Sequence, residues 1–444
     1  MAENRLPYPS KYTLDEPDAY HSTCLAIQRA VSPRSQVFYP GSPSYANNTH
    51  HWTPSSSQTS ACSVEPGTVH DVSKILKILG TTSTPFAIKS GGHATNQGFS
   101  STPGVQIALS RFNAVMYDQA SNTATIGAGL TWDTVYSKLE PFGVTVVGGR
   151  VVGVGVGGVT LGGGKHIAHF SNSFPGRTYS SHQVMDTIVA FELVLPDGEI
   201  TTVTAESNPE LSFALKGGYN NFGIVTNFVF NTFSLGPVWG GLLTYAGANF
   251  DLIVPAVADF QASNTDVDAT IVAAFTCDYD STPVFNVGAF YNGSTPPPGL
   301  FDKFFAIPRT SEDVKTRTYP ELISVTSGPY SVNLLRGAMH TVSLSHLSVG
   351  VISQVLKQTN LWPDESSDSI ARGDMKLAAA AITATAQSEG QELADLPLYS
   401  NYALGDVPLH RLYLANLPRL RSIKMKYDPL DVMALRGVSV SSGS

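Results

Sequence analysis

The stretch Pro85-Phe86-Ala87-Ile88-Lys89, continued by Ser90-Gly91-Gly92-His93, decides how this chain folds. The first five residues favour a β-strand, and the serine and two glycines that follow predict a tight loop at its end. Glycine at a strand end lets backbone N–H groups approach a ligand closely and form an anion-binding concavity. A histidine follows such a loop here, at position 93, next to whatever the loop binds.

Three further glycine clusters also follow predicted strands, at residues 148–149, 153–164 and 217–223. The chain has a formal net charge of −8 and a pI of about 5.7, and no cluster of Lys and Arg occurs. A phosphate-bearing ligand would therefore be held by backbone N–H groups, which require glycine. Four such loops predict a long ligand with a diphosphate; turns and strand kinks alone would not need so many glycines.

The run from Gly153 to Gly158 matches the pattern GxGxxG of dinucleotide-binding loops. That fingerprint needs a helix at its third glycine and an acidic residue about 20 positions later. Val159-Thr160-Leu161 is followed by three more glycines, which is poor helix material. The first carboxylate downstream is Asp186. We therefore expect no helix here and no Rossmann-type NAD site.

The composition limits the other classes of site. The chain has 444 residues, of which 42% are hydrophobic and 14% charged, enough for two or three domains. No basic stripe or apolar run of membrane length occurs, so neither nucleic acid nor a membrane is an expected partner. Three cysteines without a CxxC pair argue against structural zinc; Cys24 and Cys62 are either a disulfide or two buried thiols. His50 and His51 are expected on the surface, and no metal site is predicted.

The N-terminus lacks the apolar core of a signal peptide, and the sequence does not decide the compartment.

Periodicity predicts the elements around these loops and divides the chain into two parts. An amphipathic helix over residues 69–79 is expected to stop at Gly80. Beyond about residue 236 the glycine clusters end, and strands alternate with helices as in a separate α+β domain. The expected helices are 19–30, 69–79, 132–139, 250–261 and 349–358, and the expected strands are 85–89, 105–109, 123–126, 144–147, 188–195, 200–203, 272–275 and 284–290.

Several motifs in a fixed order give the chain a resemblance to a known family. They are Ser90–His93 with Gly98-Phe99-Ser100, Asp133-Val135-Tyr136, Gly148–Gly164, Lys216–Thr226, Tyr399–Tyr402 and Arg419–Pro429. On these residues the chain resembles the FAD-linked oxidases of the p-cresol methylhydroxylase/vanillyl-alcohol oxidase superfamily, in particular the fungal berberine-bridge-enzyme-like branch. The resemblance covers residues 20–164, 186–350 and 376–436.

The resemblance implies an α+β fold with a two-subdomain FAD-binding domain and an α+β substrate domain built on an antiparallel sheet. We expect an N-terminal arm over residues 1–57 and the FAD-binding domain over 58–235. The substrate domain would cover 236–395, shortened near 362–375. Residues 396–444 would return to the FAD-binding domain.

In the family the histidine of the Ser-Gly-Gly-His run is bonded to the 8α-methyl group of the flavin. That histidine is His93 in this sequence. Many relatives have a second, cysteinyl link at the position of Val151, so we expect one covalent link. Val154 occupies the position that in the family controls the access of dioxygen to the flavin. A small residue at this position is more typical of oxidases than of dehydrogenases. The residues expected to bind FAD are Ser90, Gly91, Gly92, His93, Gly98, Phe99, Gly149, Val154, Gly155, Gly157, Gly158, Leu161, Gly223, Ile224 and Val225. Tyr399, Asn401 and Tyr402 are expected beside the flavin ring as catalytic residues.

The implied activity is hydride transfer from an alcohol or activated C–H of a secondary metabolite or saccharide to FAD, with dioxygen as acceptor and hydrogen peroxide as product. We expect a monomer whose partners are that small molecule and dioxygen. Three stretches depart from the family pattern: 165–185, about 361–376, and the end from Gly437. In the family the residues missing from the second stretch often supply the catalytic base, so no base is named here. The alternative is therefore a catalytically impaired, flavin-binding pseudoenzyme. Arg336 and His340 are expected to form a structural pair.

Overall fold

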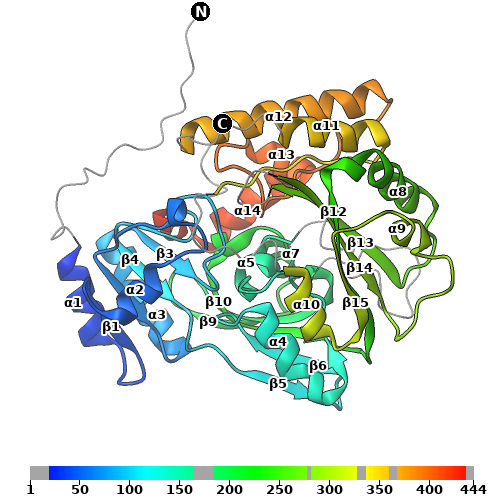
Figure 1. Cartoon of the computed structure of the whole chain (residues 1–444). Coiled ribbons are helices and arrows are strands. Elements are labelled where there is room, and N and C mark those ends of the chain that lie inside the picture. Colours follow the sequence, from blue (N-terminus) through cyan, green and yellow to red (C-terminus); the bar gives the residue numbers. More distant parts are fainter. Residues whose placement is uncertain (1–19, 164–183, 278–281, 328–336, 360–367, 437–444) are drawn as a thin grey trace, which may run out of the picture.

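The computed structural model describes residues 20–163, 184–277, 282–327, 337–359 and 368–436. Three β-sheets of four, five and four strands organise these residues, with a short two-stranded pair besides. Figure 1 shows the first two sheets side by side at one end of the molecule and the third at the other, with the long helices α11 and α12 above. The α+β class expected from the sequence is confirmed.

The first sheet has the order β1-β2-β4-β3. β2 and β3 pair in parallel with β4, and β1 adds an antiparallel edge. The segment expected as an N-terminal arm therefore supplies one strand of this sheet. A disulfide between Cys24 and Cys62 joins α1 to β2, which settles the choice left open by the sequence. The elements are α1 His21–Ala30, β1 Gln36–Phe38, α2 Pro43–Thr49, β2 Cys62–Glu65, α3 Val69–Thr82, β3 Phe86–Lys89 and β4 Val105–Ala108.

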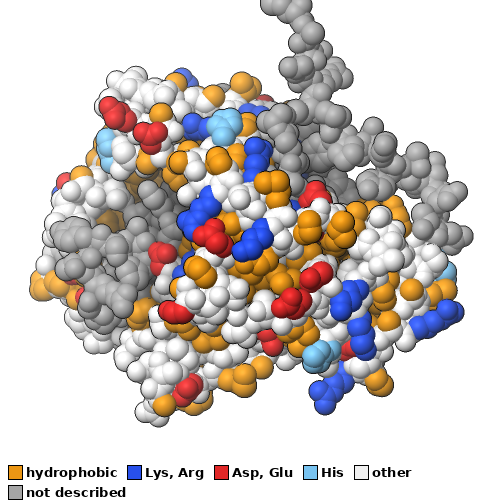
Figure 2. Space-filling view, turned by 180° about the vertical axis from the view of Figure 1, so that it is seen from behind, with side chains coloured by type: hydrophobic (Ala, Val, Ile, Leu, Met, Phe, Trp, Pro, Cys, Tyr) orange, Lys and Arg blue, Asp and Glu red, His pale blue; other side chains and the backbone are white. Residues whose placement is uncertain are grey.

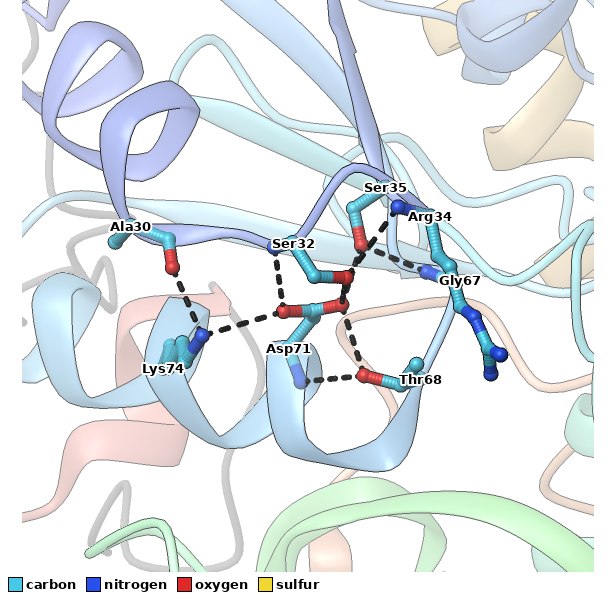
Figure 3. A network of polar contacts seen from close by, with 8 residues as sticks. All are labelled: Ala30, Ser32, Arg34, Ser35, Gly67, Thr68, Asp71 and Lys74. Atoms are coloured by element: carbon cyan, nitrogen blue, oxygen red, sulfur yellow. Dashed lines mark hydrogen bonds and ion pairs between the residues drawn. The ribbon is translucent and has the colours of Figure 1, made fainter.

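A buried carboxylate, Asp71 in the first turn of α3, ties this helix to the segment after α1 (Figure 3). Asp71 accepts hydrogen bonds from the Ser32 amide at 2.8 Å and hydroxyl at 2.6 Å, and from the hydroxyls of Ser35 and Thr68 at 2.8 Å each. Burial alone would raise the pKa of Asp71, but these donors outweigh it and lower the pKa to about 2. Thr68 also caps α3 by accepting from the Asp71 amide.

We expect Asp71→Asn to remove a stabilisation of about 2 kcal/mol, since the folded pKa of about 2 lies below the ordinary 3.8. A depressed pKa stabilises the fold above the unfolded value, and this stabilisation is lost as pH falls through the folded pKa. The difference in free energy of unfolding between wild type and Asp71→Asn should therefore shrink from pH 7 to pH 3. Urea titrations measure it, with the exposed Asp251→Asn, also in a first helical turn, as control. A difference that does not change with pH would contradict this account.

The second sheet is antiparallel throughout, in the order β5-β6-β10-β8-β9. β10 forms the centre of this sheet; its first three residues are all buried, and buried and half-buried residues alternate from there on. The rings of Phe191 and Phe228 meet edge to face in the core between its strands and α4. The elements are β5 Val115–Asp118, β6 Thr123–Gly127, α4 Trp132–Leu139, β7 Val144–Thr145, α5 Val156–Leu161, β8 Ile188–Val194, β9 Ile200–Val203, α7 Pro209–Leu215, β10 Ile224–Asn231 and β11 Phe233–Ser234, which pairs with β7.

The third sheet, in the order β13-β14-β12-β15, is also antiparallel and packs against α8 and α9. α10 connects it to the core of the first two sheets, because the ring of Tyr319 lies 4.9 Å from that of Tyr136. The elements are β12 Val238–Ala246, α8 Phe250–Ser263, β13 Ala269–Cys277, β14 Pro283–Tyr291, α9 Asp302–Phe305, β15 Ser311–Arg317, α10 Tyr319–Ser327, α11 Val349–Thr359, α12 Asp368–Ser388, α13 Leu409–Tyr413 and α14 Leu417–Tyr427.

Four sequence predictions were wrong. α3 does not stop at Gly80 but continues to Thr82, and Ser83 ends it in a left-handed conformation. The strand expected over 144–147 has only two residues. A six-residue helix, α5, does form in the glycine run after Gly155. His51, expected on the surface, is buried and bonded through its ring to the carbonyls of Thr49 and Ser100.

The surface opposite the view of Figure 1 carries charges of both signs. Figure 2 shows Lys and Arg side chains interspersed there with Asp and Glu, with hydrophobic patches between them. Among the described residues, none of the helices is both long and apolar enough to span a membrane. Within the same residues, no group of three His, Cys, Asp or Glu side chains is placed to hold a metal ion.

Candidate flavin and substrate site

Two glycine loops cross in direct backbone contact. A Cβ on Gly91 would lie 2.5 Å from the Gly155 nitrogen, and one on Gly155 would lie 2.2 Å from the Gly91 nitrogen. Ser90 connects the same loops, since its hydroxyl donates to the Ala128 carbonyl at 2.6 Å and accepts from the Gly157 amide at 3.1 Å. Only glycine permits this approach, which brings the backbone of both loops to one place.

We expect Gly155→Ala to destabilise the protein by about 1–3 kcal/mol, because its Cβ would overlap the backbone of the neighbouring loop. The matched control is Gly158→Ala in α5, where no atom of the described residues outside that helix lies within 4 Å of a Cβ. Alanine in a helix is favoured over glycine, so the control should be as stable as wild type or slightly more. Urea unfolding of the two variants in parallel measures the difference; equal stability would contradict the close approach.

A cavity of about 770 Å³ opens beside the crossed loops and extends to the third sheet. This volume falls within the range of small-molecule and cofactor sites. Its lining comes from two parts of the fold. Val272, Ala273 and Ala274 of β13, in the third sheet, line it together with the loops around Gly91 and Gly155. Of the residues that the sequence predicted for the site, the lining contains Ser90, Gly91, Gly92, His93, Phe99, Gly149, Val154, Gly155, Gly157, Gly158, Leu161, Ile224, Val225, Tyr399, Asn401 and Tyr402.

Two of the predicted residues, Gly98 and Gly223, do not line the cavity. Gly98 has a φ of +82° in the turn next to Phe99, and its amide donates to Ser101. Gly223 has a φ of +140° at the start of β10, and a Cβ there would lie 2.2 Å from the Val194 carbonyl oxygen. Both glycines shape the backbone that carries the lining residues.

His93 lies in the cavity wall with its ring stacked on Trp52, the two ring centroids 4.4 Å apart and 16° from parallel. The Trp52 amide also donates to the Gly92 carbonyl at 2.9 Å, which fixes the indole beside the loop. The Nε2 atom of His93 is buried and has no hydrogen-bond partner among the described residues. Burial lowers the pKa of His93 to about 4, partly opposed by a bond to its own backbone, so the imidazole is neutral at pH 7.

The C-terminal segment returns to the cavity through a chain of side chains. The Tyr219 hydroxyl donates to Asn401 Oδ1 at 3.0 Å, and Asn401 Nδ2 donates to the Tyr399 hydroxyl oxygen at 3.0 Å. Ser400 donates to the Gly162 carbonyl at 2.8 Å. Burial raises the pKa of Tyr399 and that of Tyr219 well above 10. Both phenols therefore stay protonated at neutral pH and act as hydrogen-bonding groups.

α12, which begins within the stretch expected to be shortened, contributes to the cavity wall. Met375 of α12 lines the cavity, and Arg372 on the same helix donates to Asn96 at 3.1 Å. His340 also lines the cavity, and its Nδ1 is buried without a hydrogen-bond partner among the described residues; the structural pair expected with Arg336 stays a prediction. Arg336 lies outside the described residues, as do positions 164–183, 360–367 and 437–444.

Sequence reasoning missed several residues of the lining. Trp52 has no motif of its own, and the two histidines before it were expected on the surface. Arg150 lies inside the quoted run Gly148–Gly164, between Gly149 and Val151, but no role was predicted for it. Tyr219 also stands inside a quoted motif; the structure gives it a φ of +56°, which few residues other than glycine adopt, and no pattern in the sequence predicts that conformation.

Comparisons with known proteins agree with this geometry. Residues 60–204 match the family described as "FAD binding domain", and residues 398–435 match "Berberine and berberine like". An FAD-dependent monooxygenase of Emericella nidulans, sdcF, is 34% identical over 338 residues, 74% of this chain and 68% of that protein. An uncharacterized FAD-linked oxidoreductase of Arthroderma benhamiae is 37% identical over 265 residues, 59% of this chain and 51% of the relative. The chain spans about half the length of the first curated relatives that it matches.

Solved structures show the same fold at low identity. The xylooligosaccharide oxidase of Myceliophthora thermophila has a TM-score of 0.73 at 19% identity, covering 96% of this chain and 100% of the other. The glucooligosaccharide oxidase of Acremonium strictum, described with 6-S-cysteinyl, 8α-N1-histidyl FAD, has a TM-score of 0.73 at 18% identity, covering 93% and 97%. The chain therefore belongs to the berberine-bridge-enzyme-like family of FAD-linked oxidoreductases, with an FAD-binding domain of the p-cresol methylhydroxylase type.

Proposed function

We propose that this chain is an FAD-dependent oxidase that takes hydride from an alcohol or activated C–H of a small molecule. The observation that carries the proposal is a single cavity lined by both the crossed glycine loops and the third sheet, with a neutral histidine in its wall. The crossed loops fit a diphosphate, because they place backbone N–H groups together in a site without clustered cations. When bound, FAD supplies the hydride acceptor, and dioxygen restores it with release of hydrogen peroxide.

We propose one covalent FAD link, at His93. Its imidazole is neutral, half-buried and stacked on Trp52, so a ring nitrogen keeps its lone pair and the ring has a fixed orientation. The A. strictum oxidase carries a cysteinyl link besides its histidyl one. In this chain Val151 stands in the cavity lining at the position predicted for that cysteine, and valine cannot form such a link.

We propose that the remaining predicted loop residues hold FAD through backbone groups and that Tyr399, Asn401 and Tyr402 orient the substrate. The Tyr219 phenol donates to Asn401, and Asn401 donates to the Tyr399 hydroxyl oxygen, which holds the protonated Tyr399 phenol beside the cavity for contact with substrate oxygens. Val154 in the lining leaves space for dioxygen, in keeping with an oxidase. Residues 236–395 would form the substrate domain, flanked by the FAD-binding domain (58–235) and by the C-terminal segment from residue 396.

His340 is the proposed proton acceptor. The described residues of the lining include no Asp, Glu, Lys or Cys, and burial keeps the phenols of Tyr219 and Tyr399 protonated. Burial lowers the pKa of His340, which the charge of Asp406 raises and that of Lys376 lowers again. The ring is therefore neutral at pH 7 and can take the hydroxyl proton of the substrate as hydride leaves.

The lining favours an apolar, conjugated metabolite over a saccharide as substrate. Sugar recognition needs free hydroxyl and amide groups, and four of those in the lining already bond within the chain: Ser90 to Ala128, Asn96 to Ala403, Ser400 to Gly162, and Asn401 to Tyr399. Aromatic and aliphatic side chains supply much of the remaining wall: Trp52, Phe99, Val272, Met339, Met375 and Tyr402. Such a wall suits a flat, apolar molecule.

Peroxide release from the purified protein tests this function. We expect yellow protein that releases hydrogen peroxide with conjugated alcohols and not with oligosaccharides. Yellow protein that reduces its flavin with none of these compounds would instead be a flavin-binding protein without turnover. Colourless protein that takes up no added FAD would contradict the proposal altogether.

A further inference from the structure

The side chain of Arg150 is placed at the junction between the flavin loops and the third sheet. The backbone next to it is anchored to the last residue of α10, Ser327, whose hydroxyl accepts from the Val152 amide at 3.0 Å and lies 3.5 Å from the Arg150 carbonyl. Arg150 lines the main cavity and also a small hollow whose other walls include Leu242 of β12 and Asn286 of β14. The side chain therefore lies on the substrate-domain side of the cavity.

Arg150 also lies close to the Tyr399 phenol. The charge of Arg150 lowers the pKa of Tyr399, against the larger effect of burial, which raises it. Tyr399 and Arg150 both line the cavity together with β13, and Val272 of β13 also borders the small hollow beside Arg150.

Arg150 is the one side chain with a fixed charge among the described residues that line the cavity. Within those residues, nothing accepts a hydrogen bond from its guanidinium and no carboxylate pairs with it; its side chain is half-buried. A guanidinium presents five donors in a planar fork that matches two oxygens of an anion. A half-buried cation without a counter-ion is costly, and a bound anion would remove that cost.

FAD itself carries an anionic diphosphate, which the crossed loops are built to receive. Backbone amides of both loops converge beside Gly91 and Gly155, whereas Arg150 faces β13 and Tyr399. We propose that Arg150 binds an ionised oxygen of the substrate, so that the preferred substrates are apolar molecules bearing a carboxylate, enolate or phenolate. This inference rests on the proposed function in one respect, that FAD and substrate share the cavity.

Ligand binding without turnover tests the proposal. The FAD-loaded protein is titrated with benzoate and with benzamide, which share ring and shape and differ in charge, and binding is followed by the flavin absorption spectrum. We expect benzoate to bind about 10- to 100-fold more tightly than benzamide to wild type, as charge-assisted hydrogen bonds allow. Arg150→Met, which keeps length but not charge, should lose that preference. Arg150→Lys, which keeps charge but not the fork, should retain part of it.

Three results would overturn the proposal. They are equal affinity of wild type for the two ligands, binding of neither ligand, and an unchanged preference in Arg150→Met. Loss of FAD from Arg150→Met would also overturn it, because Arg150 would then serve the cofactor. A charge preference that depends on Arg150 in a protein without peroxide release would refute the proposed oxidase activity and leave the anion site standing.

Discussion

Replacing His93 with alanine is expected to leave a colourless pellet after acid precipitation, whereas the wild-type pellet stays yellow. The proposed covalent link is made by the imidazole of His93, and its removal leaves FAD held only by the glycine loops. The reaction requires a neutral imidazole, which burial provides by lowering the pKa of His93 to about 4. Stacking on Trp52 at 4.4 Å holds the ring in one orientation, so little motion is needed to reach the flavin.

The matched control for His93→Ala is His340→Ala, a second histidine of the same cavity lining. This control should keep a yellow pellet, because His340 is not the proposed link. Before acid treatment, His93→Ala should still bind FAD, with the colour passing into the supernatant. A yellow pellet from His93→Ala would place the link on another residue, and a white wild-type pellet would exclude a covalent link.

The second large effect is expected for His340→Ala, in which kcat at pH 7 should fall about 100- to 10,000-fold, the usual loss when a general base is removed. Flavin content and ligand affinity should stay near wild type. In wild type, activity requires the neutral imidazole, so kcat should fall as pH decreases through the pKa of His340, which burial places below its ordinary 6.5. The groups that act on it, Asp406 and Lys376, form an ion pair with each other, which limits their net effect.

The pH profile separates a proton acceptor from a residue that only shapes the wall. His340→Ala should lose the acidic limb of the profile, and His340→Gln should not restore it, since an amide keeps polarity but accepts no proton at these pH values. A variant with nearly normal kcat, or with the acidic limb intact, would assign proton transfer to a different group.

The local pattern of the sequence was enough for about half of the described strands and for the glycine loops. Strands such as β3 and β8 follow from β-branched and aromatic residues, which are signals within a few positions, whereas β10, at the centre of the second sheet, was not among the expected strands. The sequence predicted glycine-rich loops around Gly91 and Gly155. It did not predict that these two residues contact each other. Membership of the family came from the order of the motifs rather than from any single one.

The failures of prediction have a common physical reason, which is long-range contact. α5 forms among glycines because Val156, Thr160 and Leu161 are buried, so tertiary packing overrides poor helix propensity. Gly80 stays inside α3, where its bare Cα lies against Val432, more than 300 positions away in the chain. Contacts between residues so far apart in the chain leave no pattern in the local sequence.

The same reason applies to the cavity. The pairing of Cys24 with Cys62 depends on where α1 lies against β2. The roles of Trp52, Arg150 and His340 depend on the folded chain bringing distant segments together around one cavity. Trp52 has no motif around it, and Arg150 and His340, which lie in stretches covered by the family resemblance, have no local pattern that predicts these roles. Only the fold brings an unpaired cation, a neutral imidazole and a stacked indole into one wall.

Mass spectrometry of the wild-type protein is the most direct test of the central claim, that this cavity holds FAD linked through His93 alone. The intact mass should exceed that of the polypeptide by one FAD, and fragmentation of the flavin-bearing peptide should place the flavin on His93. A flavin on any other residue, two links on one flavin, or a polypeptide mass with no FAD from yellow protein would contradict the account.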